Sequence, residues 1–169
     1  MKMIAVLGGV LAAAGSAQAG FFVEVESNDT LATANFVGSY SFPGDGFVVD
    51  GAISPSTDED WFRFSVDDAT QIRVAIFGRP NSSSGDSFLE LFDGAGSLVA
   101  SDDDSGINLF SALEYNTAGA GTYFLRVTSF RGASSFEYKM VVGLNVAPTP
   151  GSLALAGLGA LVATRRRRA

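Results

Sequence analysis

The sequence predicts an all-β domain, a sandwich of two sheets, and three observations support this prediction. Between Gly20 and Ala147, short runs of alternating apolar and polar residues are separated by glycine, aspartate and serine turns. No helical period is sustained in this part of the chain. Fourteen Phe, one Trp and four Tyr are enough for one core in a chain of 169 residues. Short strands with regular turns are typical of sandwiches.

One helical turn and eight strands are expected in chain order. The turn is Thr30–Asn35, which the cap-type residue Asp29 would open. The predicted strands are Phe47–Ile53, Trp61–Val66, Gln71–Phe77, Phe88–Phe92, Leu98–Ala100, Ala112–Tyr115, Thr122–Thr128 and Tyr138–Leu144.

Alternation predicts which side chains of these strands face the core. Along Trp61–Val66 the even-numbered residues are apolar, so they are expected inside, with Trp61 and the other odd-numbered residues outside. Along Thr122–Thr128 the odd-numbered residues Tyr123, Leu125 and Val127 are expected inside. The turn Asp93–Gly96 is typical of a hairpin between two predicted strands.

The chain contains no cysteine and no histidine. A disulfide framework, a thiol nucleophile, a Ser-His-Asp triad and a His-ligated zinc are therefore excluded. Any chemistry would depend on carboxylates, hydroxyls, lysine or a hard metal ion.

The charge is divided unevenly along the chain. Eleven basic and eighteen acidic residues give a formal net charge of -7. Lys2 and Arg165–Arg168 lie near the two ends, which leaves six basic and eighteen acidic residues between them, a net charge of -12. Such an acidic segment disfavours nucleic acid as a partner and favours cations.

Residues 1–19 are typical of a secretory signal peptide. A basic start at Lys2 precedes the apolar run Met3–Ala14, and an Ala-x-Ala spacing ends at Ala19. Signal peptidase is expected to cut there and leave Gly20 as the mature start. A retained membrane anchor is the alternative, but the apolar run is short for a span.

The C-terminal segment, residues 146–169, has three parts. A Pro-Thr-Pro motif comes first, the apolar stretch Ser152–Thr164 follows, and four arginines end the segment. The apolar stretch is expected to enter a bilayer as a helix that the arginines hold on the cytoplasmic side. The residues of the motif and of the arginine cluster are Pro148, Thr149, Pro150, Arg165, Arg166, Arg167 and Arg168.

This three-part order resembles the bacterial PEP-CTERM sorting signal, which an exosortase processes. Thr149 stands where that family usually has Glu. The resemblance implies an exosortase-type enzyme as a partner and a position on the cell surface or in the extracellular matrix. An ordinary C-terminal membrane anchor remains the alternative.

A second resemblance covers nearly all of residues 20–145. The motifs that carry it are Glu26-Ser27-Asn28-Asp29, Asp50-Gly51-Ala52-Ile53, Asp58-Glu59-Asp60-Trp61-Phe62, Leu89-Glu90-Leu91-Phe92-Asp93, Gly96 to Asp103, and Gly121 to Val127. Their order and spacing resemble the bacterial pre-peptidase C-terminal domain, to which the collagen-binding domains of clostridial collagenases are similar. The resemblance implies a jelly-roll-like antiparallel β-sandwich, and no protease domain precedes it in this sequence.

The acidic residues gather in three places along the chain. They are Glu24 to Asp29, Asp58 to Asp60, and Asp102 to Asp104. Ca²⁺ takes six to eight oxygen ligands in flexible geometry, so closely spaced acidic loop residues suit it. The third cluster starts like an EF-hand loop, but its glycine falls one place early, and a tight acidic turn is the expected structure.

The second resemblance implies the ligands of a calcium site. In the collagen-binding relatives a similar Glu-x-Glu-x-Asn-Asp segment coordinates calcium together with aspartates from a later loop. Carried over, the metal ligands are Glu24, Glu26, Asn28, Asp29, Asp58 and Asp60. Acidic loops that are merely solvated remain the alternative.

Three function classes follow from these features. The leading hypothesis is an exported, non-catalytic structural or adhesive module. The second is a carbohydrate- or protein-binding module for exopolysaccharide or a matrix protein, in which Trp61 would stack on the ligand. The third is a hydrolase with a carboxylate pair such as Glu90 and Glu114, although both residues are expected at outward-facing strand positions.

Overall fold

The computed structural model describes residues 19–41, 43–79 and 85–146. The predicted signal peptide lies outside these residues except for Ala19, and the predicted sorting signal lies outside them except for Val146. The motif Pro148, Thr149 and Pro150 and the cluster Arg165–Arg168 are therefore not described. Within the ranges given above, no helix is long and apolar enough to span a bilayer.

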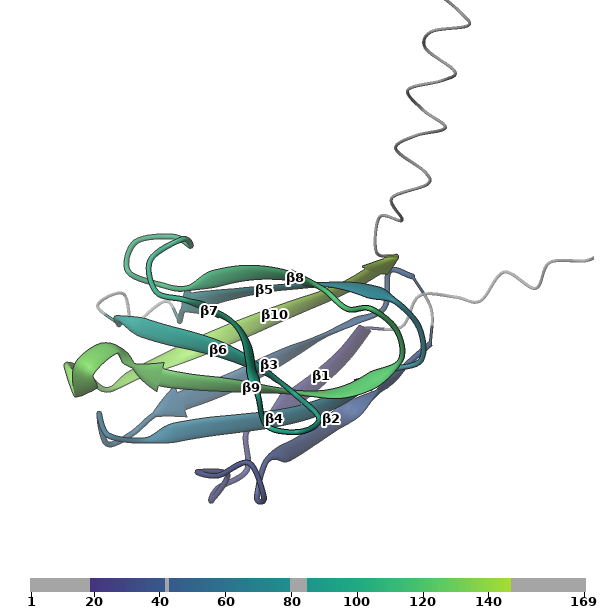
Figure 1. Ribbon diagram of the computed structural model, residues 1–169. Coiled ribbons are helices and arrows are strands. Elements are labelled where there is room, and N and C mark those ends of the chain that lie inside the picture. Colours follow the sequence, from purple (N-terminus) through teal and green to yellow (C-terminus); the bar gives the residue numbers. More distant parts are fainter. Residues whose placement is uncertain (1–18, 42, 80–84, 147–169) are drawn as a thin grey trace, which may run out of the picture.

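The described residues form ten strands and one short 3-10 helix (Figure 1). The strands are β1 (Ala19–Val23), β2 (Asn35–Tyr40), β3 (Gly46–Ile53), β4 (Glu59–Val66), β5 (Thr70–Gly78), β6 (Ser87–Asp93), β7 (Leu98–Asp102), β8 (Ala112–Asn116), β9 (Gly121–Ser129) and β10 (Phe136–Val146). The 3-10 helix, Phe130–Gly132, connects the last two strands.

Two five-stranded sheets face each other. Sheet A has the strand order β1-β3-β10-β5-β8, and sheet B has the order β2-β4-β9-β6-β7. The predicted all-β sandwich is confirmed, but a purely antiparallel arrangement is wrong: β1 pairs with β3 in parallel, and β2 pairs with β4 in parallel. The first four strands alternate between the sheets, so every second strand returns to its own sheet in the same direction.

All eight predicted strands are present, each within two residues of its predicted ends. The helical turn predicted at Thr30–Asn35 is shorter than predicted: Thr30 O accepts a bond from Thr33 N at 3.0 Å in a single turn, and β2 begins at Asn35. The strands β1 and β2 were not predicted. In β2 the register shifts between Phe36 and Gly38, so this bulge breaks the alternation that marks a strand in the sequence.

The core fills the space between the inner faces of the two sheets. Phe64 of β4 is fully buried, and its ring centroid lies 5.4 Å from that of Phe47 in sheet A and 6.0 Å from that of Tyr123 in sheet B. The predicted inward residues of β4 and β9 all belong to this core, while Trp61 and Arg63 lie on the outer face of sheet B. Aromatic contacts therefore join the sheets along β3, β4 and β9.

The two ends of the sandwich differ. Ala19 pairs with Gly46, which also pairs with Gly143, so β1 begins close to the level at which β10 ends. At the opposite end Phe136 pairs with Ile53, and the segments that follow β1 and precede β4 lie there. Both described termini thus leave from one end, as Figure 1 shows, and the other end carries the acidic loops.

We expect Phe64→Ala to lower the free energy of unfolding by about 3 to 5 kcal/mol, because it leaves a cavity between the sheets. Phe36→Ala is the matched control: Phe36 is 53% exposed, and its loss should cost about 1 kcal/mol or less. Urea denaturation of the two variants measures the difference. Equal losses would contradict the placement of Phe64 at the centre of the core.

Candidate metal centre

Two strands and the residue that follows a third strand each place an oxygen-bearing side chain near the end of the apolar core. In β4 the inward residues Phe62 and Phe64 are preceded by Asp60, the next residue on the same face, which is fully buried. In β10 Tyr138 faces inward and is fully buried as well. Glu24 directly follows β1 and continues its pairing, with its N–H bonded to Asp50 O at 3.0 Å.

Gly51 of β3 provides the space for Tyr138. A Cβ atom at residue 51 would lie 2.5 Å from Tyr138 Cζ and 2.6 Å from its hydroxyl oxygen. These distances are well below van der Waals contact, so a larger residue would displace the ring. The glycine therefore allows the tyrosine hydroxyl to reach the carboxylate across the sandwich.

Tyr138 donates its hydroxyl hydrogen to Asp60 Oδ2 at 2.6 Å. The other carboxylate oxygen, Asp60 Oδ1, is buried and has no hydrogen-bond partner in the described part of the chain. Burial, followed by the neighbouring Glu24 carboxyl, raises the pKa of Asp60 to about 10, although the hydroxyl of Tyr138 opposes the shift. Burial and the nearby Asp60 also raise the pKa of Tyr138 well above its usual value.

The two glutamates are held by backbone groups. Glu24 Oε2 accepts a bond from Ala52 N at 2.7 Å, and its Oε1 is buried without a partner in the described ranges. Glu26 Oε2 accepts from Asn28 N at 3.2 Å. Burial raises the pKa of Glu26, the bond from Asn28 N lowers it, and the Glu24, Asp58 and Asp29 carboxylates raise it further.

Asn28 is fully buried, and neither its Oδ1 nor its Nδ2 bonds any residue that the structure describes. Its backbone carbonyl does have a hydrogen-bond partner, because Asn28 O accepts a bond from Trp61 N at 3.1 Å. A buried amide without hydrogen bonds costs about 1 to 3 kcal/mol. The position is therefore unfavourable unless another group bonds these atoms.

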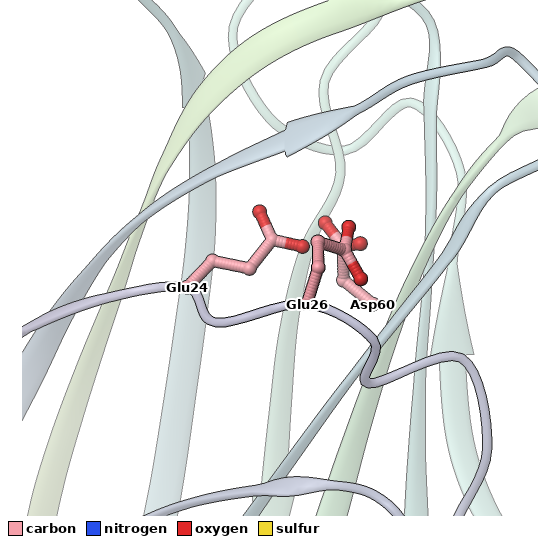
Figure 2. A group of neighbouring side chains, drawn as sticks. All are labelled: Glu24, Glu26 and Asp60. Carbon is pink, nitrogen blue, oxygen red and sulfur yellow. The ribbon is translucent and has the colours of Figure 1, made fainter.

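The structure brings the predicted ligands together. Carboxylate oxygens of Glu24, Glu26 and Asp60 lie within 4.8 Å of one another, and Figure 2 shows these three side chains directed toward a common point. Oxygens of Glu26, Asp29 and Asp58 meet the same limit. Glu26 belongs to both groups and therefore links the five predicted carboxylates, whereas Asn28, the sixth predicted ligand, belongs to neither group.

No lysine or arginine nitrogen of the described residues lies within 4.0 Å of these five carboxylates. Carboxylates that are close and partly buried repel one another unless protons or a cation neutralise them. The donors are carboxylates and an amide oxygen, the ligand set of Ca²⁺, and the chain contains no histidine or cysteine, the common ligands of softer metals. The residues therefore fit a hard divalent cation.

A second acidic group combines two residues of the third acidic cluster found in the sequence, Asp103 and Asp104, with Asp86, which was not predicted. Oxygens of Asp86, Asp103 and Asp104 lie within 4.8 Å of one another. Burial and then the Asp104 carboxylate raise the pKa values of both Asp86 and Asp103. Asp86 is far from the other two in sequence, so local spacing gave no signal for it. Asp102 is not part of this group: its Oδ2 accepts bonds from Ser105 N and Ala112 N, as expected for a tight turn.

Trp61, the predicted ligand-stacking residue, is largely covered by its neighbours. The indole lies on the outer face of sheet B, but the residue is only 7% exposed. Its ring centroid is 5.0 Å from that of Phe92, the Arg126 guanidinium lies 5.3 Å from the ring, and Nε1 donates to Glu59 Oε2 at 3.2 Å. The strand pattern predicted the face correctly but could not show that neighbouring side chains cover the ring.

Glu90 and Glu114 do not form a pair. Glu90 belongs to β6 in sheet B, where its carboxylate binds Arg126. Glu114 belongs to β8 in sheet A, where it binds Arg73 and Gln71. The two carboxylates lie on different sheets and cannot flank one glycosidic bond.

Comparison with known proteins identifies a related family for the middle of the chain. Residues 58–129 match the family model described as the bacterial pre-peptidase C-terminal domain. This segment runs from β4 to the end of β9 and includes Asp58 and Asp60 but not Glu24 to Asp29. No curated protein matches the sequence.

Two solved structures are similar to this chain. One is the pre-peptidase C-terminal domain of collagenase from Bacillus anthracis, with 16% identity, a TM-score of 0.47, and coverage of 66% of this chain and 94% of the other. The second is PliG from Aeromonas hydrophila, a periplasmic inhibitor of g-type lysozyme. It shows 11% identity, a TM-score of 0.44, and coverage of 66% of this chain and 99% of the other.

The raised pKa of Asp60 predicts how pH affects the metal-free protein. A carboxyl that is protonated in the folded chain and ionised in the unfolded chain contributes stability at low pH and loses it as pH rises. With a chelator present, the ionisation of Asp60 should lower the free energy of unfolding progressively as the pH rises from 3.8, the usual pKa of the group, toward about 10.

Asp60→Asn tests this expectation, because the amide imitates the protonated acid and still accepts a bond from Tyr138. With chelator present, the variant should match the wild type near about pH 4 and become increasingly more stable toward about pH 9. Thermal unfolding across this range measures the difference. Curves that stay parallel would show that Asp60 does not titrate in this window.

Proposed function

We propose that this chain is an exported, non-catalytic β-sandwich module that a calcium ion stabilises at its acidic end. It acts as a structural or adhesive component of the cell surface or extracellular matrix. Signal peptidase removes residues 1–19, and an exosortase-type enzyme processes the C-terminal segment, which engages the membrane before processing.

The observation that carries this proposal is the set of buried oxygens without partners. Asn28, Asp60 and Glu24 together leave three oxygen atoms buried and unbonded among the described residues. All three atoms lie on segments that converge at the end of the core. A Ca²⁺ ion bound by Glu24, Glu26, Asn28 and Asp60, with Asp29 and Asp58 beside them, supplies the positive charge that this cluster lacks.

The position of the cluster explains how the ion would stabilise the fold. Glu24 to Asn28 follow an edge strand of sheet A, whereas Asp58 directly precedes β4 of sheet B and Asp60 belongs to it. An ion between them ties the first segment of the mature chain to both sheets. Metal bound only by the folded state raises its stability by mass action.

The similarity of residues 58–129 to the pre-peptidase C-terminal domain supports a role as a non-catalytic module. The alternative of a binding module for exopolysaccharide or a matrix protein loses its predicted stacking residue, since Trp61 is covered. A hydrolase loses its named carboxylate pair, since Glu90 and Glu114 lie on different sheets.

Calcium should raise the melting temperature of the protein, and EDTA should lower it. Glu26→Gln is the sharpest variant because Glu26 belongs to both carboxylate groups. It should weaken Ca²⁺ binding at least about tenfold, or about 1.4 kcal/mol. Isothermal titration calorimetry measures the affinity.

Asp104→Asn is the matched control, since Asp104 belongs to the other acidic group. It should leave the affinity unchanged. A melting temperature that neither calcium nor EDTA alters would reject the metal centre. Calcium binding that is lost in Asp104→Asn but kept in Glu26→Gln would place the ion at the second acidic group and contradict the proposed centre.

Processing can be tested separately by intact-mass spectrometry of the protein from its native host. The expected mature chain begins at Gly20 and lacks the arginine cluster, Arg165–Arg168. A chain that retains the four arginines would contradict exosortase-type processing and support an ordinary anchor.

A further inference from the structure

One carboxamide side chain holds the backbone between two of the proposed metal ligands. Val25 lies between Glu24 and Glu26, just beyond the end of β1. Its N–H donates to Asn35 Oδ1 at 2.8 Å, and its carbonyl oxygen accepts from Asn35 Nδ2 at 2.9 Å. The Val25 residue is 66% exposed, so its side chain adds little packing to these two bonds.

An asparagine suits this contact because its carboxamide carries an acceptor and an N–H donor side by side in one plane. It therefore makes the two bonds that a residue of a neighbouring strand would make. Aspartate has no donor for the Val25 carbonyl oxygen, and alanine has neither group. Either substitution at residue 35 removes at least one of the two bonds.

These bonds connect both sheets to the segment that carries the glutamates. Glu24 is held by sheet A, since Glu24 N donates to Asp50 O at 3.0 Å and Glu24 Oε2 accepts from Ala52 N at 2.7 Å. Asn35 is the first residue of β2 in sheet B. The backbone between Glu24 and Glu26 is thus fixed from both sheets, and the two carboxylates point toward a common place (Figure 2).

The same bonds close the loop of residues 25–35, which carries three of the six proposed ligands: Glu26, Asn28 and Asp29. A loop that must be ordered when a ligand binds weakens the binding, whereas a loop that is ordered beforehand does not. The carboxylates also repel one another until a cation arrives. Bonds that close the loop oppose this repulsion in the metal-free chain.

We propose that Asn35 is a positioning residue for the metal centre, which holds Glu24 and Glu26 at the spacing that the cation needs before the cation binds. This role rests on the calcium site proposed above. Asn35 acts through the Val25 backbone and not as a ligand, because both of its polar atoms bond Val25.

Asn35→Ala in the purified full-length chain tests this role. Its calcium affinity, measured by isothermal titration calorimetry, should fall at least about tenfold. The melting temperature in EDTA should stay close to that of the wild type, because the two lost bonds are exposed to water. An about tenfold higher calcium concentration should then restore the rise in melting temperature that calcium causes in the wild type.

Hydrogen exchange and a second variant separate positioning from charge. In EDTA the Val25 N–H should exchange faster in Asn35→Ala than in the wild type. Asn35→Asp adds negative charge, which by itself would strengthen cation binding, but it loses the donor to Val25, so its affinity should also fall. An Asn35→Asp affinity equal to or above that of the wild type would assign residue 35 a role by charge or as a ligand and overturn the proposal.

Asn145→Ala is the matched control, since it makes the same change at an exposed residue of β10 away from the acidic loops. It should alter neither the affinity nor the melting temperature. A wild type that binds no calcium rejects the metal centre and this role with it. Calcium binding in the wild type with unchanged affinity in Asn35→Ala keeps the metal centre and overturns only the positioning role. An Asn35→Ala melting temperature that falls equally in EDTA and in calcium would make the asparagine merely structural and overturn it as well.

Discussion

Tyr138 donates its hydroxyl hydrogen to Asp60 Oδ2 at 2.6 Å, and this bond joins the two sheets where the apolar core ends. Tyr138 belongs to sheet A and Asp60 to sheet B, and both are fully buried. A carboxyl in this position must be protonated or bound to a cation, because its ionised form has lost its water. Gly51 leaves room for the tyrosine ring. The proposed calcium centre and the pH dependence of the metal-free protein both follow from this burial.

The two ends and the two outer faces of the sandwich carry different kinds of side chain. Acidic side chains gather at the end where Asp60 lies, and both described termini leave from the other end. The outer face of sheet A is neutral and apolar, whereas the outer face of sheet B is closed by Trp61, Phe92 and Arg126. The acidic end therefore suits a cation.

Much of the fold could be predicted because alternation is a local property. The inward residues of β4 and β9 and the hairpin at Asp93–Gly96 were predicted, and Asp93 Oδ1 accepts bonds from Ala95 N and Ser97 N in that turn. Prediction failed for β2, whose bulge interrupts the alternation. The proposed metal ligands came from a resemblance, and Asp86 was missed because its neighbours in the second acidic group are remote in the sequence.

The sequence by itself determined the all-β class, the inward faces of β4 and β9, the exclusion of cysteine and histidine chemistry, and the concentration of negative charge in the middle of the chain. Only the tertiary structure decided that the Asn28 side chain is buried with no hydrogen-bond partner among the described residues, and that neighbouring side chains cover Trp61. Composition and period-two alternation can be read from neighbouring residues. Burial and clustering depend on strands that are distant in the chain, such as β3 and β10, and on the register at which they pair.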